Sequence, residues 1–164
     1  MTDRMDVVVV GAGLAGLQCT RLLAASGLRV LLVDAKAAVD RAVHTTGIFV
    51  RRTLEDFALP EDCLGPPVRH VWLHAPSGRG ITLQSPHDEF RVGHMARWYA
   101  RYLDEGCQLG ACWAPGTRYL WSSAMSDGTR VHLQSGMRSW SVHTRYLVGA
   151  DGATSRVARD LDLD

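Results

Sequence analysis

Apolar residues near the start of the chain form two short, nearly uninterrupted runs. Residues 6–10 are mostly β-branched, which is typical of a strand buried on both faces of a parallel sheet. Residues 14–26 place apolar side chains at helical spacing, and Gly27 can end that helix in a left-handed conformation. Residues 28–33 form a second buried-type strand, closed by Asp34. The pattern predicts a right-handed βαβ unit.

The hydrophobic periodicity is weaker in the middle of the chain. Residues 53–59 indicate a short helix. Residues 68–74 alternate in polarity and, with residues 81–84 beyond a glycine-containing turn, predict a β-hairpin. Residues 95–105 predict a helix that Gly106 ends.

Alternation returns in the last third, where tight turns at Asp127-Gly128 and Ser135-Gly136 separate three predicted strands, over residues 118–125, 130–134 and 139–146. These strands form an antiparallel meander. Residues 146–151 follow with an apolar stretch that again resembles a buried parallel strand.

The predicted fold class is therefore α/β. It combines a Rossmann-like βαβ unit with a parallel sheet, an inserted β-hairpin and an antiparallel β-meander. We expect one cofactor-binding domain over residues 1–164. The antiparallel meander distinguishes this chain from a plain doubly wound fold, in which strands and helices alternate throughout.

Composition and charge exclude several classes of protein. The formal net charge is +1 and the arginines are scattered, which argues against a nucleic-acid partner. No stretch approaches the roughly 20 apolar residues of a membrane span. Asp3, Arg4 and Asp6 precede the first apolar run, unlike a signal peptide, so we expect a cytoplasmic protein. The oligomeric state is left open.

A glycine loop joins the first predicted strand to the first helix. Gly11, Gly13 and Gly16 fit the spacing G-x-G-x-x-G. The first glycine permits a tight turn, the second lets backbone approach a pyrophosphate, and the third lets helix and strand pack closely. The predicted phosphate-binding loop comprises Gly11, Ala12, Gly13, Leu14, Ala15 and Gly16.

An acid follows the second predicted strand, at Asp34, 18 residues after Gly16. A carboxylate at this point can accept hydrogen bonds from both ribose hydroxyls of an adenosine, and it disfavours a 2′-phosphate. We place Ala35 and Lys36 in the same site. These features predict a bound dinucleotide but do not separate FAD from NAD.

A second motif distinguishes the two cofactors. Residues 147–156 read L-V-G-A-D-G-A-T-S-R, which closely resembles the second conserved element of the FAD-dependent oxidoreductase superfamily of aromatic hydroxylases (flavin monooxygenases) and geranylgeranyl reductases. The resemblance covers nearly the whole chain, as the N-terminal portion of the family fold. It implies FAD as the cofactor, with Asp151 and Gly152 near the ribityl and pyrophosphate region. Ser155 is expected to cap the helix that follows.

The chain also departs from the family's pattern. Relatives carry an arginine near the cofactor before the meander, and Arg91 and Arg97 are both candidates, with solvent-exposed arginines flanking a helix as the alternative. Relatives also carry a Gly-Asp pair in a third motif, and this sequence contains no Gly-Asp pair. We therefore expect the chain to correspond to part of a longer fold, with most of the substrate domain absent.

The resemblance implies a flavin-dependent oxidoreductase, of the monooxygenase or the prenyl-reductase type. The same resemblance implies a small aromatic or prenyl substrate, with NAD(P)H as a possible electron donor. One alternative is a non-catalytic or truncated nucleotide-binding module, and another is an NAD-dependent dehydrogenase domain. No catalytic residue can be named from the sequence. No metal site is expected, since His70 and His74 lie on a predicted strand, where four residues span about 13 Å.

Overall fold

The computed structural model of the protein describes residues 4–163. The chain divides into two compact units. Unit 1 contains the residues through Ala42 together with those from Tyr99 onward, and unit 2 is Val43–Trp98. Each unit is described separately.

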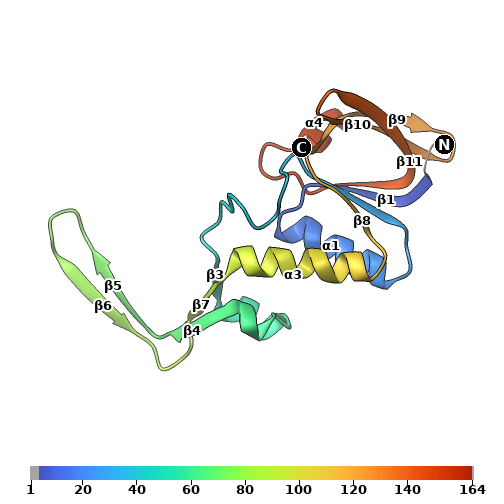
Figure 1. The fold of residues 1–164 in the computed structure, drawn as a ribbon. Coiled ribbons are helices and arrows are strands. Elements are labelled where there is room, and N and C mark those ends of the chain that lie inside the picture. The colour runs from blue at the N-terminus through green and yellow to red at the C-terminus, as the bar shows by residue number, and fades with distance from the viewer. Residues whose placement is uncertain (1–3, 164) are drawn as a thin grey trace. The chain divides into compact units, whose positions relative to one another are not determined.

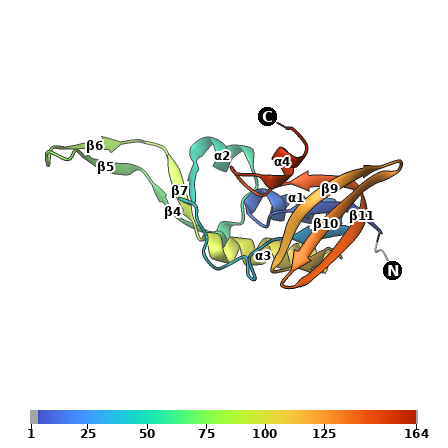
Figure 2. The same ribbon diagram turned by 90° about the horizontal axis from the view of Figure 1, so that it is seen from above.

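Unit 1 is built on a six-stranded sheet with the order β8-β2-β1-β11-β10-β9 (Figures 1 and 2). Its strands are β1 (Arg4–Val10), β2 (Val30–Val33), β8 (Cys112–Ala114), β9 (Thr117–Met125), β10 (Gly128–Ser135) and β11 (Arg138–Gly149). Its helices are α1 (Leu14–Ala25), α4 (Arg156–Asp160) and the part of α3 (Met95–Gln108) that begins at Tyr99. Strands β8, β2, β1 and β11 are parallel, whereas β9 and β10 continue the sheet in antiparallel pairing.

The predicted βαβ unit is confirmed. The four residues of β2 and the last four of β1 are all buried, because helices and the meander cover the two faces of these strands. Gly27 ends α1 with a φ of 78°, in the left-handed region that glycine adopts at low cost. Strand β2 begins at Val30, two residues later than the hydrophobic run.

The end of the meander and the last predicted parallel strand form one strand, not two. The first half of β11 pairs with β10 in antiparallel register, up to Thr144 opposite Thr129. Its second half pairs with β1 in parallel register, from His143 opposite Arg4 to Gly149 opposite Val10. A single strand of twelve residues therefore links the meander to the βαβ unit formed by β1, α1 and β2.

The core of unit 1 lies between the parallel strands and the meander, because the antiparallel strands curl over one face of the sheet (Figure 2). Its buried members are Val8, Val10, Leu31, Val33, Tyr119, Val131, Leu133, Val142 and Val157. Gly149 permits α4 to approach β11, since a Cβ on this residue would lie 2.9 Å from Cβ of Val157. This packing holds the carboxyl ends of β1, β2 and β11 together.

Helices α1 and α3 pack side by side in unit 1 (Figure 1). The prediction that Gly106 ends α3 is wrong, because the helix continues to Gln108 and Gly110 adopts the positive φ, at 96°. A Cβ on Gly106 would stand 3.5 Å from Cγ2 of Thr20 on α1. This glycine therefore marks a helix–helix contact. Arg21 bridges the same interface through Glu105, with 3.4 Å between Nη1 and Oε2.

Unit 2 contains a three-stranded sheet of order β3-β7-β4 and a separate two-stranded ribbon, β5-β6. Its elements are β3 (Ile48–Val50), α2 (Arg51–Asp56), a 3-10 turn η1 (Glu61–Cys63), β4 (Leu64–Val68), β5 (His70–His74), β6 (Gly80–Gln84) and β7 (Phe90–Gly93). The predicted hairpin is confirmed as β5-β6. The predicted short helix is confirmed with a shift, and the predicted strand 68–74 is divided between β4 and β5.

Among residues 4–163, every helix is too short or too polar to span a lipid bilayer.

Candidate cofactor site

The loop between β1 and α1 is shaped by two glycines that leave no room for a side chain. Gly11 has a φ of 105°, and a Cβ on it would lie 2.3 Å from the carbonyl oxygen of Ala150. A Cβ on Gly16 would lie 1.8 Å from the carbonyl oxygen of Gly11. The first and third glycines of the motif thus allow loop, helix and the end of β11 to approach one another.

Gly13, the second glycine of the motif, faces open space. It is the N-cap of α1 in an extended conformation, and a Cβ on it would meet no protein atom within 4 Å. No side chain caps the helix, and no acidic residue lies in its first turn. The first turn of a helix carries unpaired N–H groups and a partial positive charge. This end of α1 is suited to an anionic group, and a phosphate can occupy the space that a Cβ would fill.

Asp34 holds the glycine loop and its own turn together. Its Oδ2 accepts a hydrogen bond from the N–H of Ala12 at 2.7 Å, and its Oδ1 accepts one from the N–H of Lys36 at 2.8 Å. The N–H of Thr117, at the start of β9, donates to the carbonyl oxygen of Asp34 at 2.8 Å. The glycine loop, the turn after β2 and the start of β9 therefore meet at Asp34, the first two through its carboxylate and the third through its backbone carbonyl.

The second motif follows β11 and is tied to β1 by a hydrogen bond from the N–H of Ala150 to the carbonyl oxygen of Val10, at 2.7 Å. The carboxylate of Asp151 accepts hydrogen bonds from the hydroxyl of Ser155 and from the N–H groups of Arg156 and Val157. Partial burial acts to raise the pKa of Asp151, but these three donors outweigh it and the pKa lies below its ordinary value.

The predicted cap on α4 is confirmed. The Ser155 hydroxyl oxygen accepts a hydrogen bond from the N–H of Ala158 at 2.9 Å. Gly152 adopts a φ of 87°, and its carbonyl oxygen accepts from the N–H of Ser155 at 3.0 Å. Asp151 and Gly152 thus form a tight turn between β11 and α4, with the Asp151 side chain directed to the helix.

Both motifs line one open cavity of about 450 Å³ within unit 1. Its walls are formed by Val10, Gly11, Gly13, Asp34, Ala35, Lys36, Thr117, Arg118, Tyr119, Ala150, Asp151, Gly152 and Arg156. Among the remaining predicted site residues, Ala12 contributes its N–H to Asp34, Gly16 packs beneath Gly11, and Leu14 and Ala15 begin α1 outside the lining.

Three cationic side chains, those of Lys36, Arg118 and Arg156, border this cavity. None of them forms an ion pair with another residue in the range 4–163. Their charge and the uncapped end of α1 favour an anionic ligand such as a pyrophosphate.

Residues 117–119 line the cavity although the sequence does not predict them as site residues. Their position depends on the long-range pairing of β9, and no local signal indicates it.

Tyr119 anchors the wall of the cavity. Its hydroxyl donates a hydrogen bond to the carboxylate of Asp160, which also accepts from the N–H of Ser122 at 2.9 Å. Burial, together with the hydrogen bond to Asp160, raises the pKa of Tyr119 to about 12. The same hydrogen bond from Tyr119 is the main reason that the pKa of Asp160 lies below its ordinary value. This pair connects β9 to α4.

The two candidate arginines lie in unit 2, and both have carboxylate partners there. Arg91 on β7 contacts Glu61 at 2.7 Å and donates from Nε to the carbonyl oxygen of Gly65, also at 2.7 Å. Arg97 contacts Asp62 at 2.8 Å. These contacts attach η1 to β7 and α3, and a role for either arginine toward a cofactor stays a prediction.

No cluster of three or more histidine, cysteine, aspartate or glutamate side chains suited to a metal ion occurs within residues 4–163. His70 and His74 lie at the two ends of strand β5.

Comparison with known proteins gives consistent matches. The FAD binding domain family matches residues 4–58. The 2,4-dichlorophenol 6-monooxygenase of Cupriavidus pinatubonensis is 29% identical over 99% of this chain and 31% of its own length. The digeranylgeranylglycerophospholipid reductase of Methanothrix thermoacetophila is 25% identical over 98% of this chain and 42% of its own length. The chain therefore spans less than half the length of each of these curated relatives.

The fold is shared with a geranylgeranyl bacteriochlorophyll reductase-like protein from Thermoplasma acidophilum. The TM-score is 0.82 at 20% identity, and the match covers 99% of this chain and 43% of the solved structure. The predicted fold class is confirmed.

Proposed function

We propose that the two motifs of this chain hold FAD and that the whole protein is a flavin-dependent oxidoreductase, because residues 4–58 match the FAD binding domain family and the chain is similar to parts of an aromatic monooxygenase and a digeranylgeranyl lipid reductase. The observation that carries the proposal is the single cavity on which both motifs converge. In this proposal, residues 1–164 serve as one cofactor-binding domain.

The glycine loop and Asp34 would bind the ADP half of the cofactor. The N–H groups at the start of α1 face the open space beside Gly13, where a pyrophosphate can approach the backbone. Asp34 lies at the end of β2 beside the loop, and its carboxylate would accept hydrogen bonds from ribose hydroxyls. Lys36, Arg118 and Arg156 would neutralise phosphate charge at the rim.

The second motif would border the pyrophosphate and ribityl region. Its Asp151 carboxylate is already bound by three donors from the start of α4, so its part is to hold the turn in shape. The left-handed Gly152 exposes backbone to the cavity at that turn. We therefore assign positioning to the side chain of Asp151 and ligand contact to the backbone of the turn.

Bound FAD would supply the redox chemistry of its isoalloxazine ring. The residues of this chain bind and orient the cofactor, and none of them is assigned as an acid, base or nucleophile. For the whole protein we propose a small aromatic or prenyl substrate, NAD(P)H as electron donor and a cytoplasmic location. Support for the substrate class comes from relatives whose names specify a dichlorophenol and a digeranylgeranyl lipid.

An absorbance spectrum of the purified chain tests FAD binding directly. We expect flavin bands that remain with the protein through gel filtration, or that appear after incubation with added FAD. Matched incubations with FAD and with NAD⁺ separate the two dinucleotides. A folded chain that takes up neither would contradict the proposal, and uptake of NAD⁺ alone would favour a dehydrogenase domain.

A further inference from the structure

Helix α4 carries a basic and an acidic residue four positions apart, Arg156 and Asp160. Side chains at this spacing meet on the surface of a helix. The same spacing gives ion pairs on the other helices, between Arg51 and Glu55, Arg52 and Asp56, and Arg101 and Glu105. Within residues 4–163, however, Arg156 is ion-paired neither with Asp160 nor with another acid. The arrangement on α4 therefore has a local cause.

That cause is a set of three donors on β9 that hold one oxygen of the Asp160 carboxylate. Oδ2 accepts hydrogen bonds from the hydroxyl of Tyr119, from the N–H of Ser122 at 2.9 Å and from the hydroxyl of Ser122 at 3.1 Å. The pKa of Asp160 is lowered mainly by the hydrogen bond from Tyr119, and the charge of Arg156 lowers it less than any of these donors does. The carboxylate is thus bound to the strand and not to the arginine of its own helix.

Arg156 is exposed and lines the proposed cofactor cavity together with Gly152. Its backbone N–H donates to the carboxylate of Asp151 at 2.6 Å, so this arginine begins α4 directly at the second motif. A guanidinium has five N–H donors and a permanent charge, and its planar shape matches two oxygens of a phosphate. Without an acidic partner, the donors of Arg156 are available to an anionic ligand in the cavity.

The position of α4 does not depend on Asp160 alone. The side chain of Val157 is 2% exposed and packs against Gly149 on β11. The hydroxyl of Ser155 caps the helix through the N–H of Ala158. Changes to the hydrogen bonds of Asp160 should therefore alter the pairing of Arg156 without displacing the helix.

We propose that Tyr119 and Ser122 are positioning residues for the cofactor, which hold Asp160 so that Arg156 is free to bind the pyrophosphate of FAD. The role of Arg156 presupposes the proposed FAD site. It adds a condition to that site, because an acid on the same helix competes with the phosphates for the guanidinium unless β9 holds the acid.

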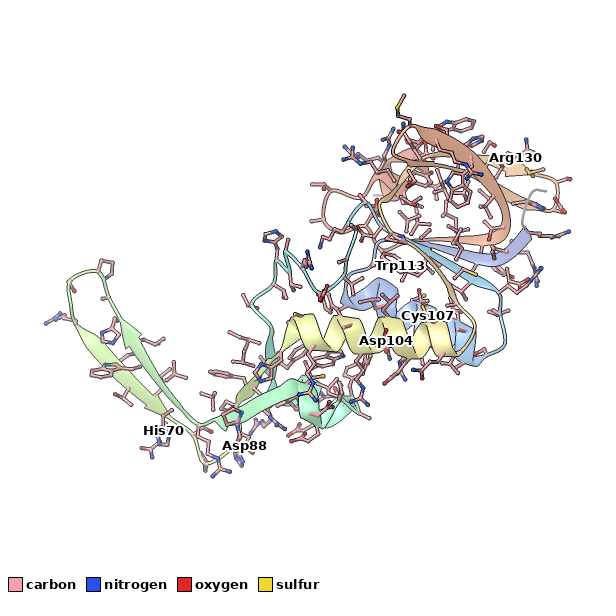
Figure 3. The ribbon with its side chains drawn as sticks, viewed as in Figure 1. His70, Asp88, Asp104, Cys107, Trp113 and Arg130 are labelled. Carbon is pink, nitrogen blue, oxygen red and sulfur yellow. The ribbon has the colours of Figure 1, made fainter. Side chains whose placement is uncertain are left out.

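FAD titration of the full chain, followed by flavin fluorescence, tests the role of Arg156. Arg156→Gln should weaken FAD binding by roughly 10-fold or more, as expected for the loss of a hydrogen bond to a charged group. The matched control is Arg130→Gln, which removes an exposed arginine on β10 outside the cavity lining (Figure 3) and should leave FAD affinity unchanged. Equal FAD affinity of Arg156→Gln and wild type would overturn the proposal.

The double variant Tyr119→Phe with Ser122→Ala tests the role of β9, because it removes both hydroxyl donors and lets Asp160 pair with Arg156. It should weaken FAD binding by about two- to five-fold, the strength of an exposed ion pair. Addition of Asp160→Ala to the double variant should restore the FAD affinity of wild type, because the competing acid is then absent. A purely structural role of these hydrogen bonds predicts no such rescue, and a triple variant as weak as the double variant would overturn the proposal.

Asp160→Ala alone provides a second test that keeps both hydroxyls of β9. This variant should bind FAD at least as tightly as wild type, since Arg156 stays unpaired and a negative charge near the phosphates is removed. Weaker binding by this variant, with thermal unfolding showing a folded chain, would show that Asp160 acts by another route and would overturn the proposal.

Inorganic pyrophosphate separates the role of Arg156 from the identity of the cofactor. Pyrophosphate binding that is lost in Arg156→Gln, in a chain that does not take up FAD, would support the role of Arg156 and contradict the FAD site alone. A wild-type chain that binds FAD without dependence on Arg156 would overturn the role of Arg156 alone. A folded wild-type chain that binds neither FAD nor pyrophosphate would overturn both proposals.

Discussion

The carboxylate of Asp34 accepts a hydrogen bond from the backbone N–H of Ala12, with 2.7 Å between Oδ2 and N. The bond fastens the end of β2 to the glycine loop that follows β1. Because the other carboxylate oxygen accepts from Lys36, both oxygens hold backbone before any ligand is bound. Asp34 thus shapes the loop that the proposed cofactor would contact.

Replacement of this acid should weaken cofactor binding. In Asp34→Ala, loss of charge-assisted hydrogen bonds should reduce FAD affinity by roughly 1–3 kcal/mol, or about 5- to 150-fold. Titration with FAD, followed by flavin fluorescence, measures the change. Asp40→Ala removes an exposed carboxylate after the same strand and should leave affinity unchanged. Unchanged affinity in Asp34→Ala would remove this residue from the site.

The second and third glycines of the loop should respond differently to alanine. Gly13→Ala should change the free energy of unfolding by no more than about 1 kcal/mol, because its Cβ meets no protein atom, yet it should lower FAD affinity. Gly16→Ala should destabilise the chain by about 1–3 kcal/mol or more, because its Cβ collides with the carbonyl of Gly11. Urea unfolding without FAD, paired with FAD titration, separates the effects. Equal losses of unfolding free energy in Gly13→Ala and Gly16→Ala would contradict this prediction.

Asp151 should contribute to the acid sensitivity of the fold. Its pKa is lower in the folded chain than its ordinary value of 3.8, so its contribution to stability is present above that value and is lost as the pH falls below it. The Asp151→Asn variant should therefore be less stable than wild type at pH 7. Its stability should also fall less than that of wild type when the pH is lowered. Thermal unfolding of the FAD-free chain between pH 7 and 3 measures this, with Asp40→Asn as the control. Parallel pH profiles for Asp151→Asn and wild type would refute the prediction.

Tyr119 should make the fold sensitive to alkali. Its folded-state pKa of about 12 lies above the ordinary value of 10.0, so the neutral hydroxyl stabilises the fold below pH 10, and this contribution is lost as the pH rises from about 10 to about 12. Tyr119→Phe should be less stable at pH 8 and should show a smaller further loss at higher pH. Denaturant unfolding at pH 8 and pH 11 provides the measurement. Tyr146→Phe, at an exposed tyrosine, is the matched control.

Much of the local structure of this protein is determined by its sequence alone. The β-branched runs and the helical spacing between them specify β1, α1 and β2, because burial on both faces requires continuous apolar strands. The alternation and turn residues of the last third specify β9 and β10. The glycine loop and the Asp151-Gly152 motif also predict the resemblance to FAD-dependent oxidoreductases, and the comparisons confirm that resemblance.

Only the tertiary structure decided features that depend on contacts distant in the sequence. Strands β3, β7 and β8 are three or four residues long, too short for a periodic signal, and exist through pairing with their neighbours. The sequence pattern predicts that the helix ends at Gly106, because the packing of α1 against this glycine is not visible in the sequence. Residues 117–119 enter the cavity wall only through the curl of the meander over β1 and β2. The sequence therefore determined which motifs are present, whereas long-range strand pairing decided which other residues surround them.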